Sequence, residues 1–240
     1  MRTSAFSPQL RQLLRADSMH RSTGGEFARV IPPAAAIVNL FGCASFEHLL
    51  RDDPQGHFCA LFFLAESAIL IALCLSSFVS GTFPLLVQTR VLPIPRADRF
   101  LFALAAEMRR GIVLALVGST VFFLLFVYHH SAAVACAAAG SYLLCVAAVE
   151  TAAIALALVA SHSTYPAAMG IALGGMALLG LTIGLLSPDM TAFLASCPPS
   201  RWAAASVMAA SAGNGWSFLA NECLVAATAG IAVMVGRRAG

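Results

Sequence analysis

Three glutamates stand inside long apolar runs of the sequence, at Glu66, Glu150 and Glu222. An ionised side chain at the centre of a bilayer costs about 2.5–3.5 kcal/mol on insertion scales. Each glutamate is therefore expected to face the interior of a helix bundle, to pair with another group, or to carry a proton. One interpretation is a polar translocation path or a proton relay. The other is a hydrogen bond to a neighbouring helix.

The residue types argue against most other chemistry. All 14 basic residues are arginine, so the chain lacks the lysine that a Walker A phosphate loop or a Schiff base requires. It contains no HExxH or GxSxG motif, and the adjacent His129 and His130 fall in a tight turn that suits no single metal ion. The seven cysteines have no CxxC spacing, and all but Cys197 lie in or at the edge of apolar runs, which is typical of small buried hydrophobes. We expect no catalytic residue, metal or cofactor in this chain, so that any ATP and Mg²⁺ would belong to a partner subunit.

The elements that must position the glutamates are membrane-spanning helices. Hydrophobic residues make up 60% of the 240-residue chain and charged residues only 10%, whereas soluble domains carry about 25% charged residues. The mean hydropathy is +0.85. Roughly twenty apolar residues cross a bilayer as a helix, and the chain holds six such runs, at residues 30–46, 58–80, 112–128, 132–160, 167–186 and 216–235. The expected fold is an all-α integral membrane protein with one six-helix transmembrane domain over residues 30–236.

The arginines predict the orientation of this domain. With the N-terminus inside, the cytosolic segments hold all the arginines except Arg51 and Arg201, as the positive-inside rule requires. A seven-span alternative would move Arg237 and Arg238 to the outside, so six spans fit better. We therefore expect both termini in the cytosol, with residues 237–240 as a short cytosolic tail.

Two segments outside the spans have recognisable patterns. Residues 1–29 are polar and arginine-bearing, with leucines at helical spacing, and predict an amphipathic helix in the interface. A disordered tail is the alternative. Residues 187–215 are expected to form a less regular outer segment before the last span.

The most distinctive segment is the cytosolic connection over residues 81–111. Pro93 and Pro95 end the preceding helix, and Asp98 suits the first turn of a new helix. That helix has an apolar face beginning at Phe100, and Arg109 and Arg110 close it at the membrane surface. It is shaped either to dock into a groove of a partner or to lie on the inner leaflet, held by its arginines.

The string LPIPRADRFLFALAAEMRR resembles the coupling loop of ABC-2-type permeases, the membrane subunits of bacterial ABC transporters. The stretch CPPSRWAAASVMAASAGNGW is similar to the outer segment before their last span. The chain departs from that family at Pro95, where a polar residue is common. The resemblance implies a permease that dimerises with a second copy or a paralogue in the bacterial inner membrane. It also implies a separate ATP-binding subunit that docks on this loop, and the docking residues would be Arg96, Asp98, Arg99, Phe100, Arg109 and Arg110.

The function expected is therefore half of a translocation path in an ATP-driven transporter, with no enzyme activity of its own. An ion-coupled secondary carrier or a lipid-handling protein that uses the buried glutamates is the alternative. A structural subunit of a membrane complex is a third. The bilayer is a partner in every case, and nucleic acid is a partner in none.

Overall fold

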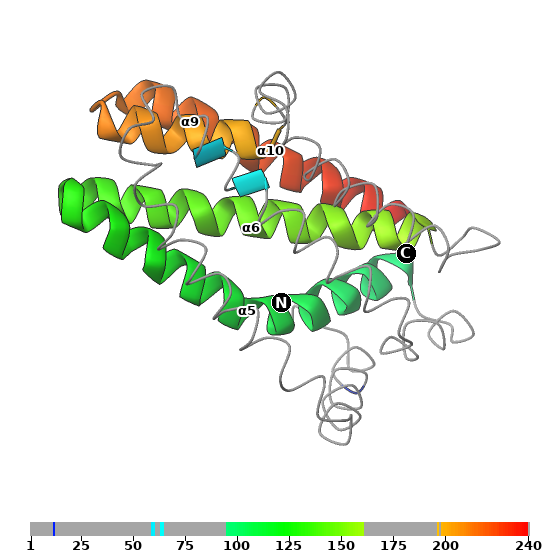
Figure 1. Cartoon of the computed structure of the whole chain (residues 1–240). Helices are drawn as coiled ribbons and strands as arrows, with labels where there is room; N and C mark the ends of the chain where they lie inside the picture. The colour runs from blue at the N-terminus through cyan, green and yellow to red at the C-terminus, as the bar shows by residue number, and fades with distance from the viewer. Residues whose placement is uncertain are drawn as a thin grey trace, which may run out of the picture.

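The computed structural model of the chain describes residues 95–160 and 198–239, together with residues 12, 59–60, 63–64 and 196. This part of the chain is helical and contains no strand, so the all-α prediction is confirmed for it (Figure 1). The expected spans 30–46 and 167–186 lie outside the described residues, as do the expected segment 1–29 apart from residue 12 and most of the span 58–80.

Helix α5 covers Arg96–His129 without a break. Its 34 residues correspond to about 51 Å at 1.5 Å per residue. The helix begins after Pro95, whose carbonyl oxygen accepts hydrogen bonds from the backbone N–H groups of Asp98 and Arg99 at 3.0 and 3.2 Å. Asp98 lies in the first turn, as predicted.

The cytosolic helix and the span from residue 112, expected as two elements, are thus one helix. The only weak helix former at their junction is Gly111, which costs a helix about 1 kcal/mol and does not by itself break one. Helix geometry therefore passes through the charged pair Arg109 and Arg110 into the apolar run.

Helix α6 covers Ala132–Ala160, the residues expected for the fourth span. It follows α5 after a tight turn, in which His130 donates to the carbonyl of Phe126 at 2.8 Å. The Ser131 hydroxyl accepts from the backbone N–H of Val134, a helix N-cap contact. Helix α6 runs antiparallel to α5 and also packs against α9 and α10, which makes it the central helix of the described bundle (Figure 1).

Helices α9 (Ser200–Ser211) and α10 (Gly215–Ala239) form a hairpin. Gly213 has a φ of 71°, and the N–H groups of Gly213 and Asn214 reach back to the carbonyls of Ala210 and Ala209 at 3.1 and 2.9 Å. This pair of bonds is a Schellman motif, which requires a left-handed residue that glycine adopts without strain. The Asn214 side chain then caps α10 by accepting from the N–H of Ser217 at 3.1 Å.

The hairpin corrects one expectation, since residues 200–211 of the segment expected to be irregular are helical. With 12 residues, α9 is about 18 Å long and α10, with 25, is about 37 Å long. Because the turn is tight, α9 lies along only the first half of α10.

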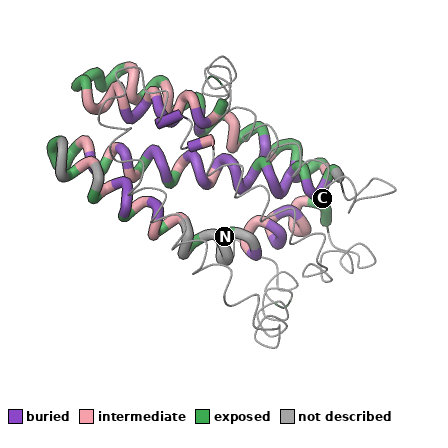
Figure 2. Tube along the Cα trace, in the orientation of Figure 1, coloured by how far each residue is buried: buried purple, intermediate pink, exposed green. Residues whose placement is uncertain are grey.

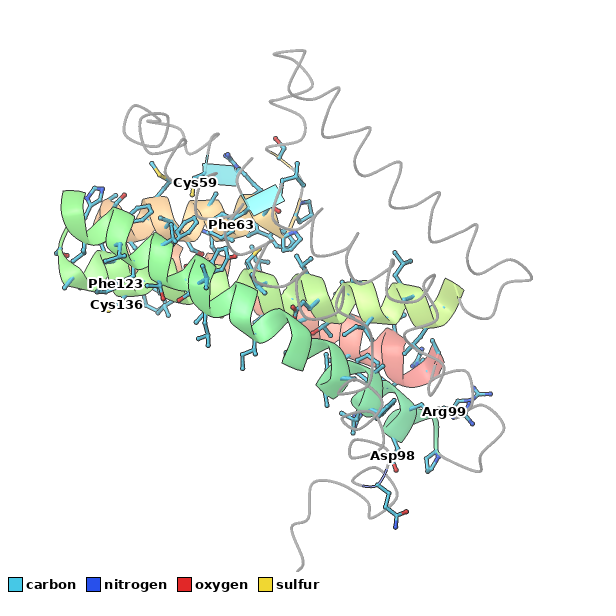
Figure 3. All side chains as sticks on the ribbon, turned by 60° about the horizontal axis from the view of Figure 1, so that its bottom comes forward. Cys59, Phe63, Asp98, Arg99, Phe123 and Cys136 are labelled. Carbon is cyan, nitrogen blue, oxygen red and sulfur yellow. The ribbon has the colours of Figure 1, made fainter. Side chains whose placement is uncertain are left out.

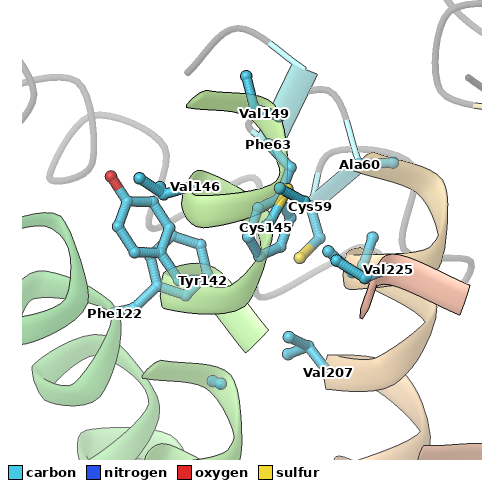
Figure 4. Close-up of a cluster of buried hydrophobic side chains, with 14 of the residues drawn as sticks. Cys59, Ala60, Phe63, Phe122, Tyr142, Cys145, Val146, Val149, Val207 and Val225 are labelled. Atoms are coloured by element: carbon cyan, nitrogen blue, oxygen red, sulfur yellow. The ribbon is translucent and has the colours of Figure 1, made fainter. Parts of the chain in front are cut away.

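Two clusters of buried residues hold the bundle together. Figure 2 shows that buried residues occur on all four helices. In the first cluster, the rings of Phe122 and Tyr142 stack at 5.2 Å, and Phe63 lies 5.2 Å from Phe122 (Figure 4). Val207 of α9 and Val225 of α10 complete it from the other side. In the second cluster, Phe100, Phe102, Ala103 and Ala106 of α5 pack with Ala153, Ile154 and Leu158 of α6.

Two helices of the described part are long and apolar enough to cross a membrane, α6 over Ala132–Val159 and α10 over Gly215–Ala239. They differ in burial, because 61% of the apolar window of α6 is buried but only 11% of that of α10. Helix α10 is therefore a peripheral helix with a wide exposed apolar surface. By length and composition, both helices are compatible with a membrane location.

Candidate functional site

A polar contact between two helices of the bundle joins Ser141 of α6 to Glu222 of α10. The Ser141 hydroxyl donates to Oε1 of Glu222 at 2.5 Å. Ser141 is buried and Glu222 is half-buried. Each residue lies about five positions from the middle of its helix, which is roughly 7–8 Å along the axis. In a helix that crosses the hydrocarbon, this depth makes a carboxylate costly, and the hydroxyl offsets part of that cost.

Glu150 does not share this site. It is buried on α6, but nine residues separate it from Ser141, which is half a revolution at 100° per residue and roughly 14 Å along the axis. The neighbouring Thr151 donates to its own helix, at the carbonyl of Ala147, 2.6 Å away. The structure therefore places Glu150 and Glu222 on opposite sides of α6, and Glu66 lies outside the described residues.

We expect the Ser141–Glu222 bond to contribute modestly to stability. Removing the donor with Ser141→Ala is predicted to lower the free energy of unfolding by about 0.6 kcal/mol, and by no more than about 1.7 kcal/mol, the range of interhelical hydrogen bonds in membrane proteins. Denaturant titration in detergent, followed by helix circular dichroism, measures this loss. Ser206→Ala is the matched control, because Ser206 is also buried but donates to its own helix at the Trp202 carbonyl. A larger loss in the control would contradict the assignment.

The expected docking residues separate into three groups in the structure. Arg96 is exposed, and Asp98 and Arg99 are half-buried at one end of the bundle (Figure 3). Phe100 is completely buried and sits against Gly236 of α10, so closely that a Cβ atom there would overlap its ring. A docking role for Phe100 does not fit this burial, and its contacts make it a packing residue between α5 and α10.

The third group is the pair Arg109 and Arg110, which was expected at the membrane surface. Their backbone lies one helical turn beyond Ala106, which belongs to the same buried cluster as Ala153 of α6. Glu150 lies one turn from Ala153 in the same direction, because α5 and α6 are antiparallel. Along the bundle axis, the backbone of the two arginines therefore lies level with Glu150. It is several helical turns away from the end of the bundle at which Arg96 lies.

Sequence reasoning missed the position of Arg201. It was expected in an outer segment, but it is a half-buried residue in the first turn of α9. From the hairpin turn it lies about 18 Å back along α9 at 1.5 Å per residue, beside the middle of α10. The signal that could have revealed this is the short sequence Ala-Gly-Asn at residues 212–214, which predicts a tight helical hairpin.

The site offers hydrogen bonding and charge. Among the residues that the structure describes, no group of three or more His, Cys, Asp and Glu side chains could hold a metal ion. The geometry provides a central helix with the Ser141–Glu222 contact on one face and the buried Glu150 on the opposite face, and a charged turn at the start of α5.

Comparison of the chain with protein-family models, with curated proteins and with solved structures found no match.

Proposed function

We propose that the chain is the membrane-spanning permease subunit of an ATP-driven transporter of the ABC type. It would cross the bacterial inner membrane six times, with both termini in the cytosol, and form half of a translocation path with a second copy or a paralogue. A separate ATPase would dock at the start of α5. The sequence resemblance motivates this proposal, and one feature of the fold supports it best.

That feature is the continuity of α5. A single helix leads from the charged turn at Arg96, Asp98 and Arg99 to the far end of the bundle at His129. An unbroken helix transmits a displacement of one end to the other, whereas a flexible linker absorbs it. A partner that moved the charged turn would therefore also move the aromatic stack around Phe122 and Tyr142.

The docking surface is smaller than the one expected from the sequence. Phe100 is buried and Arg109 and Arg110 lie deeper along the bundle, so the surface reduces to the first turn of α5. There Arg96, Asp98 and Arg99 present two positive charges and one negative charge. Such a surface fits a partner that offers both carboxylates and a basic group.

The test is purification of the tagged chain from its native membrane in mild detergent, with mass spectrometry of the proteins that accompany it. We expect a P-loop ATPase in the wild-type sample and at least a tenfold loss of it with Asp98→Asn combined with Arg99→Gln, a pair of changes that keeps the net charge constant. Cys136→Ser is the control, because Cys136 is exposed near the opposite end of the bundle (Figure 3). Recovery of the chain without any ATPase would refute the proposal.

An ion-coupled carrier receives less support. Its glutamates would need to act along one path, and the two candidate glutamates in the described part, Glu150 and Glu222, lie on opposite sides of α6. If Glu150→Gln abolished transport while the Asp98 and Arg99 changes had no effect, this alternative would replace the proposal.

A further inference from the structure

Arg237 and Arg238 lie in the last turn of α10, at the end of its exposed face. At 100° per residue, they lie about 60° to one side and 40° to the other side of Met234, which is 59% exposed. Ile231 and Val235 lie on the same outward face and are also exposed. Gly236, which contacts Phe100, points in nearly the opposite direction. The two arginines are thus directed away from the bundle, above a strip of apolar side chains.

The depth of Arg237 and Arg238 in a bilayer can be estimated from Trp216, at the opposite end of α10. Trp216, in the first turn of α10, is 85% exposed, and tryptophan concentrates at the boundary between hydrocarbon and headgroups. About six helical turns separate Trp216 from Arg237, roughly 32 Å at 1.5 Å per residue. The hydrocarbon core of a bilayer is about 30 Å thick. With Trp216 at one boundary, the arginine pair lies at headgroup level on the other side.

The start of α5 lies beside this pair. Phe100 packs on Gly236, the residue that precedes Arg237, and the end of α10 at Ala239 joins the same apolar cluster. Arg96 and Arg99 belong to this neighbouring turn, with a single acidic residue, Asp98, between them. The local charge is therefore strongly positive, and it is assembled from two stretches that are distant in the sequence.

We propose that Arg237 and Arg238 bind the phosphate of an anionic glycerophospholipid whose acyl chain lies on Ile231 and Met234. Charge complementarity selects the anionic headgroup, and the apolar strip directly below the arginines selects a lipid over a soluble anion or an acidic protein surface. Clusters of arginine at the ends of membrane helices bind anionic lipids in this way. The inference rests on the membrane location in the proposed function, but not on the ATPase partner.

The test is native mass spectrometry of the purified chain, after exchange into detergent that contains phosphatidylglycerol or phosphatidylcholine with identical acyl chains. We expect the wild type to retain phosphatidylglycerol preferentially. Arg237→Gln combined with Arg238→Gln should weaken its retention roughly thirtyfold, since each arginine near a surface strengthens binding about fivefold. The double lysine variant, which keeps both charges, should retain most of the binding. Arg201→Gln, a single charge removed from α9, should leave it unchanged.

Equal retention of the two lipids by the wild type would overturn the proposal. So would unchanged retention of phosphatidylglycerol in the double glutamine variant. If that variant lost a co-purifying ATPase but kept the lipid, the arginines would belong to a protein interface instead. A chain that binds phosphatidylglycerol through the pair but brings no ATPase would support the lipid site while refuting the transporter assignment.

Discussion

Replacing Gly118 with alanine is expected to lower the free energy of unfolding by about 1–3 kcal/mol, the usual cost of overpacking a core. A Cβ atom at Gly118 would overlap the hydroxyl end of the Tyr142 side chain. The ring is completely buried and stacked on Phe122, with Phe63 nearby, so it has no free space to enter. Alanine is otherwise favoured over glycine in a helix by about 1 kcal/mol, and the overlap must exceed this gain.

Gly140→Ala is the matched control and should have the opposite sign. Gly140 lies on α6, is exposed, and has nothing within 4 Å of the position that its Cβ atom would take. We expect a stabilisation of about 0.5–1 kcal/mol from helix propensity alone. Denaturant titration in one detergent measures both variants. In a Tyr142→Leu background the cost of Gly118→Ala should nearly vanish, and an unchanged cost would show that the ring is not its cause.

Gly236→Ala is the second change with a large expected effect. A Cβ atom there would overlap the ring of Phe100, which is completely buried between α5 and the end of α10. We expect a loss of about 1–2 kcal/mol, at the lower end of the overpacking range, because the last turn of a helix can partly yield. The change should also separate the start of α5 from α10.

Gly230→Ala supplies its control on the same helix, because Gly230 is exposed and has open space around it. This variant should be neutral or slightly stabilising. A distance between spin labels on Arg96 and Arg238 should increase in Gly236→Ala and stay constant in Gly230→Ala. Equal stability and equal distances in the two variants would contradict the packing of Phe100 on Gly236.

The parts of the fold that the sequence predicts are those set by local patterns. Helix α6 has the bounds expected for it because an apolar run with one charged residue, Glu150, follows a turn at His130 and Ser131. Asp98 lies in a first helical turn because Pro95 ends what precedes it. These features need only neighbouring residues, so hydropathy and helix-end preferences suffice to find them.

The features that could not be predicted depend on contacts between distant residues. In the sequence, Phe100 belongs to an apolar helix face that could dock a partner. In the structure this side chain packs on Gly236, a residue far along the chain that the sequence pattern does not connect with it. A pair of arginines before an apolar run, such as Arg109 and Arg110, usually marks the membrane surface. Their actual position along the bundle axis depends on how α5 and α6 are aligned, and that alignment places their backbone level with Glu150. Ser141 was not singled out at all, because a serine in an apolar run gains meaning only when Glu222 lies opposite.

The turn at Gly213 and Asn214 has a consequence for how the protein is made. All its hydrogen bonds join residues no more than five positions apart, so the hairpin of α9 and α10 needs no other part of the chain to form. The two helices can therefore pair as soon as both have been synthesised, and this pairing places Arg201 beside the middle of α10. Because Gly236 lies in the last turn of α10, the start of α5 can close onto it only after this hairpin has been synthesised.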